Sequence, residues 1–392
     1  MKYDRTLTIS YAAVQSVFWM VICVSFSFAA VYLQGLGYSN TELGVILAAG
    51  HLLGAILGPA LSSLIDRSDR VTAAGMLPPV LTVQLFSLAL LLLSPAKGWI
   101  TRAAFVLNST AALCANSPIL KIYIDFSHSG KRINFGAARA IGSLAFVLIS
   151  ALLGIWVERT SVRIIPVVCL VLCCLQFVFW GLLCRGADLQ SAPFPDKRGS
   201  GMIGFVRQNP RFCVLLIGMV FLFFAHNTLN NFFINVARSA GGDTETMGWL
   251  NAFVAAVEVP VMLLIGALRG SRSNVDLLRF SFVFFTIKAL AVSLAPNVPT
   301  LFAALLLQAP SFALYAAVIV DYTDEVVPFA DAAKAQSLVY STTTLGSVLA
   351  SIVSGRLLDA VSVRETMLIA CAVCAVGTIV TWFGLEDKKP AS

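Results

Sequence analysis

About a dozen strongly apolar stretches, each roughly 20 to 25 residues long and joined by short polar turns, run along the whole chain. A helix needs about 20 apolar residues to cross the ~30 Å hydrocarbon core of a bilayer. Each crossing must also satisfy its own backbone hydrogen bonds, because hydrocarbon offers no partners, and a helix does so. The pattern therefore predicts an all-α membrane protein that moves something across a bilayer, and it disfavours catalysis in water.

The balance of charge supports this class. Hydrophobic residues make up 58% and charged residues 12% of the 392 residues, whereas a soluble domain carries about 25% charged residues. The net charge of +7 does not indicate a nucleic-acid partner, because the cations occupy short loops and form no basic stripe. The positive-inside rule explains them better.

The nine cysteines lie almost entirely inside apolar runs. The densest group, Cys169, Cys173 and Cys174, has no histidine or acid beside it. We therefore expect packing residues and no metal site. The first apolar run is too long for a signal peptide and lacks a small-residue cleavage site, so we expect it to remain as a helix.

Twelve transmembrane helices follow from the apolar runs, with a polar segment, Gly186 to Gln208, after the sixth. Six spans, a linker and six spans are typical of two similar halves. The expected domains are residues 1–186, a cytoplasmic linker at 187–208, and residues 209–392. The predicted spans are 9–34, 42–65, 71–94, 102–124, 133–157, 162–185, 209–237, 244–268, 275–295, 299–323, 333–357 and 362–384.

Lysines and arginines fall mostly in the loops on the side of the N-terminus. This asymmetry predicts that both termini are cytoplasmic, in a bacterial inner membrane.

Glu258 is the carboxylate nearest the middle of a predicted span, and Lys288 lies at a similar depth in the next one. An ionisable group in hydrocarbon is a functional candidate by default. Burial favours the neutral form of a carboxyl group, so Glu258 could bind and release a proton. Counted from their shared turn, the two residues differ in depth by only ~5 Å, so they could form a charge pair. A structural acid and a lysine reaching towards the interface are the alternatives.

Arg139 lies early in the fifth span, beside the small residues Gly136 and Gly142. Its planar guanidinium suits a carboxylate, a phosphate or a pair of hydroxyls. Lys121, near the inner end of the fourth span, could lie close to it. The alternative for Lys121 is a residue of the inner face that pairs with Asp125 one turn later.

The seventh predicted span is unusually rich in polar side chains. Such groups need partners in hydrocarbon, so they would line a wet cavity and bind a hydroxyl-rich solute, or else bond between helices. The histidine could be a second proton site. The group comprises His226, Asn227, Thr228, Asn230, Asn231 and Asn235.

The turn after the second span resembles the inner-loop signature of the major facilitator superfamily, Gly-x-x-x-Asp-Arg-x-Gly-Arg. Here the stretch runs from Ser62 to Arg70, with Asp66, Arg67 and Arg70 matching and Ser62 and Asp69 replacing the glycines. The resemblance implies two pseudo-symmetric six-helix bundles, with Asp66, Arg67 and Arg70 bracing the inner face.

Within this superfamily the chain looks most like the proton symporters of oligosaccharides, nucleosides and arylpropionic acids. The fifth-span run from Phe135 to Phe146 is similar to their signature. The resemblance places Arg139 on the substrate-binding arginine and Phe146 on an aromatic residue that stacks on a sugar. Glu258 and Lys288 also fall on matching positions of the eighth and ninth spans.

The departures from the lactose-type members concern their charged residues. Lys121 stands where they place a carboxylate, and Gln308 stands where they place a histidine. Asn227 and Thr343 replace their carboxylate–lysine pair. A lactose-like site is therefore disfavoured, and the two cations Lys121 and Arg139 are compatible with an anionic solute.

The sequence thus predicts a secondary transporter, with no cofactor, that imports a small polar organic solute with protons by alternating access. Efflux of drugs or metabolites and a non-transporting membrane sensor are the alternatives. An enzyme is disfavoured by the lack of metal-ligand or nucleophile clusters. Its expected partners are the solute, protons and the lipid bilayer, and the sequence leaves the oligomeric state open. The expected site residues are Glu258, Lys288 and His226 for protons, and Arg139, Phe146, Lys121, Asn227, Asn230, Asn231 and Gln308 for the solute.

Overall fold

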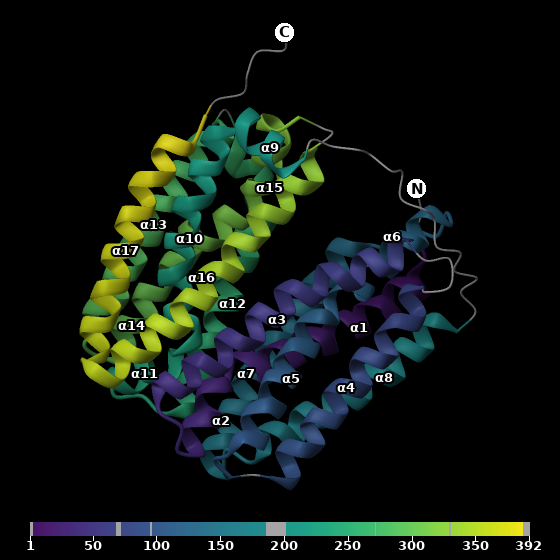
Figure 1. The fold of residues 1–392 in the computed structure, drawn as a ribbon, viewed down its shortest axis with the longest axis vertical. Helices are drawn as coiled ribbons and strands as arrows, with labels where there is room; N and C mark the ends of the chain where they lie inside the picture. Colours follow the sequence, from purple (N-terminus) through teal and green to yellow (C-terminus); the bar gives the residue numbers. More distant parts are fainter. Residues whose placement is uncertain are drawn as a thin grey trace. The chain divides into compact units, whose positions relative to one another are not determined.

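The computed structural model describes residues 3–67, 72–94, 96–185, 201–270, 272–328 and 331–386. In these ranges, 12 helices are long and apolar enough to cross a membrane. They confirm the predicted all-α architecture of twelve spans (Figure 1). The spans are Arg5–Ser27, Asn40–Ile65, Ala73–Leu93, Trp99–Ser127, Phe135–Arg159, Ile164–Cys184, Pro210–Asn231, Thr244–Gly266, Asn274–Leu294, Val298–Val326, Lys334–Ala360 and Val363–Gly384.

The chain divides into two compact units. Unit 1 comprises Met1–Pro195 with Asp243–Ala252, and unit 2 comprises Asp196–Gly242 with Phe253–Ser392. The first turns of α12 (Thr244–Arg269) therefore group with unit 1 and the rest of that helix with unit 2.

Unit 1 is built from a packed set of helices in which α1 contacts α7 and α8, α3 contacts α5, and α4 contacts α5 and α8. Its first span ends in the π-helix η1, and its fourth span is interrupted at Ala115, where α5 gives way to α6. The elements are α1 (Arg5–Ile22), the π-helix η1 (Cys23–Ser27), α2 (Ala29–Gly35), α3 (Asn40–Arg67), α4 (Ala73–Leu93), α5 (Trp99–Cys114), α6 (Asn116–His128), α7 (Phe135–Arg159) and α8 (Ile164–Cys184).

Unit 2 packs α10 against α16 and α17, and α13 against α15 and α17. Its elements besides α12 are α9 (Met202–Gln208), α10 (Pro210–Asn231), α11 (Phe233–Ser239), α13 (Asn274–Leu294), α14 (Val298–Leu305), the 3₁₀ turn η2 (Leu306–Gln308), the π-helix η3 (Ala309–Ala313), α15 (Leu314–Val326), α16 (Ala332–Ala360) and α17 (Val363–Gly384).

Close helix packing in unit 2 depends on glycine. A Cβ atom added at Gly218 of α10 would lie 2.6 Å from Thr381 Cγ2 and 2.9 Å from the carbonyl oxygen of Gly377, both on α17. Small residues allow helix backbones to approach closely inside a bilayer. The α10–α17 contact therefore leaves no room for a side chain at this position.

The tenth span, Val298–Val326, is not a regular α-helix. Its middle changes from the 3₁₀ turn η2 to the π-helix η3, which contains Pro310. Proline has no N–H to continue the helical ladder. Ser281 of α13 donates its hydroxyl to the carbonyl oxygen of Ser311 at 2.8 Å. This bond satisfies a backbone carbonyl group within the irregular segment. Gln308 is the last residue of η2, directly before the π-helix.

Candidate coupling and substrate site

Four polar side chains from four elements of unit 2 form one continuous row of hydrogen bonds, named here the polar row. Gln308 of η2 donates its amide nitrogen to Glu258 Oε1 of α12 at 2.7 Å. Lys288 of α13 donates to Gln308 Oε1 at 2.8 Å. The same Lys288 nitrogen lies 3.1 Å from Nδ1 of His226 on α10. Glu258 and Lys288, which the sequence places at similar depths, are thus connected through the Gln308 amide.

Hydrogen-bond chemistry fixes the direction of the polar row. An ammonium group has donors only, and an ionised carboxylate has acceptors only. The amide oxygen of Gln308 must therefore face Lys288, and its NH₂ group must face Glu258, as the structure has them. With a lysine ammonium as donor, His226 accepts at Nδ1 and carries its proton on the other nitrogen. With Lys288 charged and Glu258 ionised, every hydrogen bond of the polar row has one donor and one acceptor.

The row runs from a buried end to a more accessible end. Lys288 and Gln308 are each 2% exposed and His226 is 7% exposed, whereas Glu258 is half-buried. The imidazole of His226 stacks on Phe312 with the ring centroids 4.6 Å apart. Lys288 Nζ lies 5.3 Å from the centre of the Phe285 ring. Among the four residues, Glu258 is therefore the one most open to exchange with its surroundings.

Two amides of the polar α10 segment bond to the neighbouring helix α16. Asn227 donates to the carbonyl oxygen of Thr343 at 3.1 Å, and Asn231 donates to the hydroxyl of Ser351 at 2.9 Å. These contacts match the interhelical alternative for the segment. Asn230 is half-buried and makes no side-chain hydrogen bond to the described residues. Of the three amides, Asn230 is the one whose donors and acceptor remain available to a solute.

In unit 1, Arg139 of α7 is held by a ladder of side chains on α1. Its guanidinium carbon lies 3.8 Å from the ring centre of Trp19, and Nη1 donates to Ser143 at 3.0 Å. Trp19 donates to Gln15 at 3.1 Å, and Gln15 donates to the Tyr11 hydroxyl at 2.9 Å. Sequence reasoning missed these supports, although Tyr11, Gln15 and Trp19 recur at every fourth residue and so share one helix face.

The other predicted residues of unit 1 are less closely tied to Arg139. Lys121 and Asp125 form an ion pair within α6, 3.8 Å apart and nearly buried. This is the alternative weighed for Lys121. Phe146 is half-buried on α7, two turns after Arg139. Both its role and that of Lys121 in solute binding stay predictions.

The inner-loop residues lie at the edge of what the structure describes. Asp66 and Arg67 end α3, but the placement of their side chains is not described, and Arg70 falls outside the described residues. Within the described ranges, no group of three or more His, Cys, Asp or Glu side chains is placed to hold a metal ion.

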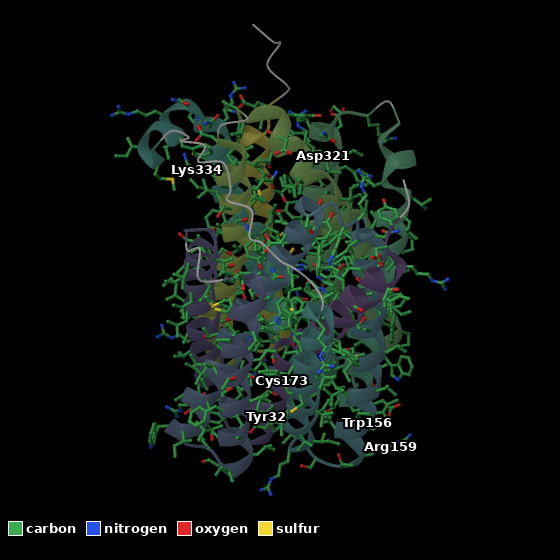
Figure 2. The ribbon with its side chains drawn as sticks, turned by 90° about the vertical axis from the view of Figure 1, so that its right-hand side faces the viewer. Tyr32, Trp156, Arg159, Cys173, Asp321 and Lys334 are labelled. Atoms are coloured by element: carbon green, nitrogen blue, oxygen red, sulfur yellow. The ribbon has the colours of Figure 1, made fainter. Side chains whose placement is uncertain are left out.

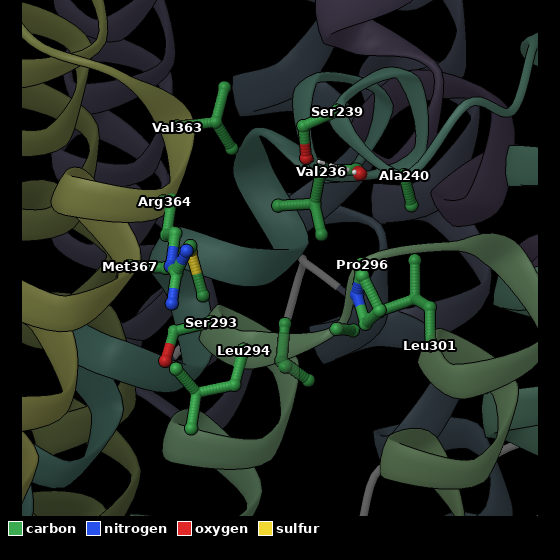
Figure 3. Close-up of a pocket in the computed structure, with 12 residues that line it drawn as sticks. Val236, Ser239, Ala240, Ser293, Leu294, Pro296, Leu301, Val363, Arg364 and Met367 are labelled. Atoms are coloured by element: carbon green, nitrogen blue, oxygen red, sulfur yellow. Dashed lines mark hydrogen bonds between the residues drawn. The ribbon is translucent and has the colours of Figure 1, made fainter.

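A small cavity of about 170 Å³ also occurs in unit 2 (Figure 3). It lies beside the ends of α11, α13 and α17, where Ser239, Ser293 and Arg364 supply its polar edges. None of the sequence-predicted site residues lines this cavity. It is therefore separate from the polar row.

Comparison with known proteins places the chain in a family. The family described as "MFS_1 like family" matches residues 8–369, which is nearly the whole chain. The chain belongs to this family. The protein is therefore an integral membrane transporter of the major facilitator type, as the inner-loop resemblance implied.

Individual relatives are more distant. A protein of Deinococcus radiodurans named for sugar efflux transport is 25% identical over 365 residues, covering 89% of each chain. A variant of the nucleoside transporter NupG superposes with a TM-score of 0.83 at 13% identity, covering 97% of this chain and 100% of that one. The POT family transporter PepTSo gives a TM-score of 0.77 at 10% identity, and the match covers 97% of each chain. At these identities, the structural matches establish the fold of this family member and nothing finer.

Proposed function

We propose that this transporter couples the movement of protons to that of a small polar organic solute by alternating access. The observation that carries the proposal is the polar row, in which a half-buried carboxyl group is linked to a buried ammonium group. An ionisable pair of this kind is costly inside a bilayer, and proton relays are a recurrent reason for it. The family membership supports transport, and the polar row supports the coupling of transport to protons.

Protonation of Glu258 would change the whole row. It removes the negative charge that Gln308 donates to, and hydrogen bonds to a charged group are roughly twice as strong as neutral ones. Gln308 is then held mainly by Lys288, and α12 is released from its charged tie to η2 and α13. A proton at Glu258 therefore alters how tightly three spans of unit 2 are joined.

Arg139 is the proposed anchor for the solute. Its guanidinium offers five donors in a fixed plane, and the Trp19 stack and Ser143 restrict its orientation. A preorganised fork suits a carboxylate, a phosphate or adjacent hydroxyls. Sugars, nucleosides and organic acids all present such groups.

The test begins with a binder and then measures protons. A thermal-shift screen of sugars, nucleosides and aromatic acids on the purified protein identifies a ligand, because binding to the folded state raises the melting temperature. In proteoliposomes, addition of that ligand should alkalinise the outer medium for the parent protein. Glu258→Gln should abolish the pH change, whereas Glu245→Gln, at the start of the same helix, should retain it. A Glu258→Gln protein that still moves protons with the solute at the parental rate refutes the coupling role.

Sugar efflux is the second candidate, because the Deinococcus radiodurans relative carries that name. The two directions are separable with preloaded vesicles. Efflux driven by an opposing proton gradient predicts that an acidic outside accelerates release of a preloaded sugar. Symport predicts that the same gradient slows release and drives accumulation.

A further inference from the structure

An apolar groove of about 450 Å³ runs between α7 and α8 in unit 1. Ile149 and Trp156 of α7 line one wall, and Val167, Val171 and Leu172 of α8 line the other. Its volume falls within the range of ligand pockets, about 300–1,000 Å³. Its lining is almost wholly apolar, unlike the polar row and the surroundings of Arg139, so it suits a hydrocarbon chain and not a polar solute.

The groove approaches the turn that joins its two helices, and that turn is basic. Arg159 is the last residue of α7 and Arg163 is the residue before α8. Both are exposed, and each is next in sequence to a lining residue, Thr160 or Ile164. Trp156 and Arg159 lie at the same end of unit 1 (Figure 2). An apolar groove with two arginines at one end is complementary to a lipid that has an acyl chain and an anionic headgroup.

The carboxylate next to this turn in sequence already accepts a hydrogen bond. Glu158 accepts a hydrogen bond from the backbone N–H of Thr244 at 3.1 Å. No ion pair of Arg159 or Arg163 occurs among the described residues. Both guanidinium groups therefore keep donors for an external anion.

The depth of this end also fits a headgroup. The helix α7 has 25 residues, and at about 1.5 Å per residue it is longer than the ~30 Å hydrocarbon core. Its terminus therefore reaches the interfacial layer, where tryptophan side chains are enriched. Trp156 is 42% exposed, which agrees with such a position.

We propose that the α7–α8 groove binds an anionic glycerophospholipid, with one acyl chain along Val167 and Val171 and the phosphate on Arg159 and Arg163. Guanidinium groups bind phosphate in a bidentate manner. The site is independent of the proposed solute and of proton coupling.

The experiment uses the purified full-length protein in detergent with equal amounts of phosphatidylglycerol and phosphatidylcholine, and counts retained lipids by native mass spectrometry. The parent should retain phosphatidylglycerol several-fold more than phosphatidylcholine. Replacing Arg159 and Arg163 together by Gln should bring the ratio close to one. Arg356→Gln, an exposed arginine on α16, is the control and should leave the ratio unchanged.

A second pair of variants tests the groove itself. Val171→Trp should fill it and lower the retention of phosphatidylglycerol. Val178→Trp, two turns further along α8, should not, although its parent side chain is similarly exposed, at 56% against 54% for Val171. Equal retention of the two lipids by the parent protein overturns the proposal. So does a preference for phosphatidylglycerol that survives both the double arginine change and Val171→Trp, since that lipid would be bound elsewhere.

A second copy of the chain could fill the groove instead of a lipid. The parent protein would then form dimers that Val171→Trp disperses, and that result also overturns the proposal.

Discussion

The amide nitrogen of Gln308 lies 2.7 Å from Glu258 Oε1, while the amide oxygen of the same residue accepts from Lys288 at 2.8 Å. One neutral side chain therefore stands between an acid and a base on two different helices. When the charge of one partner changes, the hydrogen bond between that partner and the amide changes in strength. The hydrogen bond on the other side of the amide then changes as well. Its removal should disconnect them.

Gln308→Leu tests this bridge. Leucine has a similar volume but no hydrogen-bonding groups, so Glu258 and Lys288 lose their common partner while the packing is nearly kept. We expect solute transport to continue at a reduced rate with fewer protons moved per solute molecule, measured as alkalinisation of the outer medium against solute uptake into the vesicles. Gln336→Leu, which removes a half-buried amide on α16 that bonds to α15 outside the polar row, should keep the parental ratio. An unchanged ratio in Gln308→Leu would contradict the bridging role.

Lys288 and Glu258 should be coupled in stability. Lys288→Met leaves Gln308 Oε1 and His226 Nδ1 without their donor, and an unsatisfied buried polar group costs roughly 1–3 kcal/mol. Adding Glu258→Gln to this variant removes the charge that has lost its counterpart. We therefore expect the double variant to unfold at a higher temperature than the sum of the single effects predicts. Strictly additive shifts in melting temperature would show that the two residues act independently.

Arg139→Lys should weaken solute binding without unfolding the protein. Lysine keeps the positive charge but loses the planar fork and the stacking on Trp19. We expect the KM for the solute to rise by about tenfold or more, a loss of roughly 1.4 kcal/mol, with a smaller change in maximal rate. Arg207→Lys on α9 is the control, and its KM should match the parent's. Equal KM values for Arg139→Lys and the parent would exclude Arg139 as the anchor.

Two glycines should respond to alanine with opposite signs. At Gly218 the added methyl group meets Thr381 and Gly377, and overpacking typically costs about 1–3 kcal/mol. At Gly181 of α8 no atom lies within 4 Å of an added Cβ, so alanine should stabilise the helix by roughly 0.5–1 kcal/mol. The measurement is the melting temperature of each variant. A Gly218→Ala protein that is as stable as the parent would show that α10 and α17 are less closely packed than the structure has them.

The helical architecture was predictable because span length and apolar content are set by the thickness of the bilayer. Counting along helices also placed Glu258 and Lys288 at similar depths, since the rise per residue is constant. What lies between them was not predictable. Gln308 reaches that place from the 3₁₀ turn η2, between the α-helix α14 and the π-helix η3. No periodicity locates a side chain in such a break. The ladder from Tyr11 to Trp19, by contrast, was visible in the spacing, and only its pairing with Arg139 required coordinates.

The π-helix Ala309–Ala313 closes each turn over one residue more than an α-helix does. The stretches Val298–Leu305 and Leu314–Val326 therefore do not share one angular register about the helix axis. Loss or gain of a single residue at this point in a homologue would turn one stretch relative to the other by about 100°, the angle per residue of an α-helix. Such an indel would bring a different side chain to face Lys288 while the buried contacts of Leu314–Val326 persist. Natural variation in chain length at residues 309–313 is thus a route by which related proteins can exchange the group that joins the acid to the base.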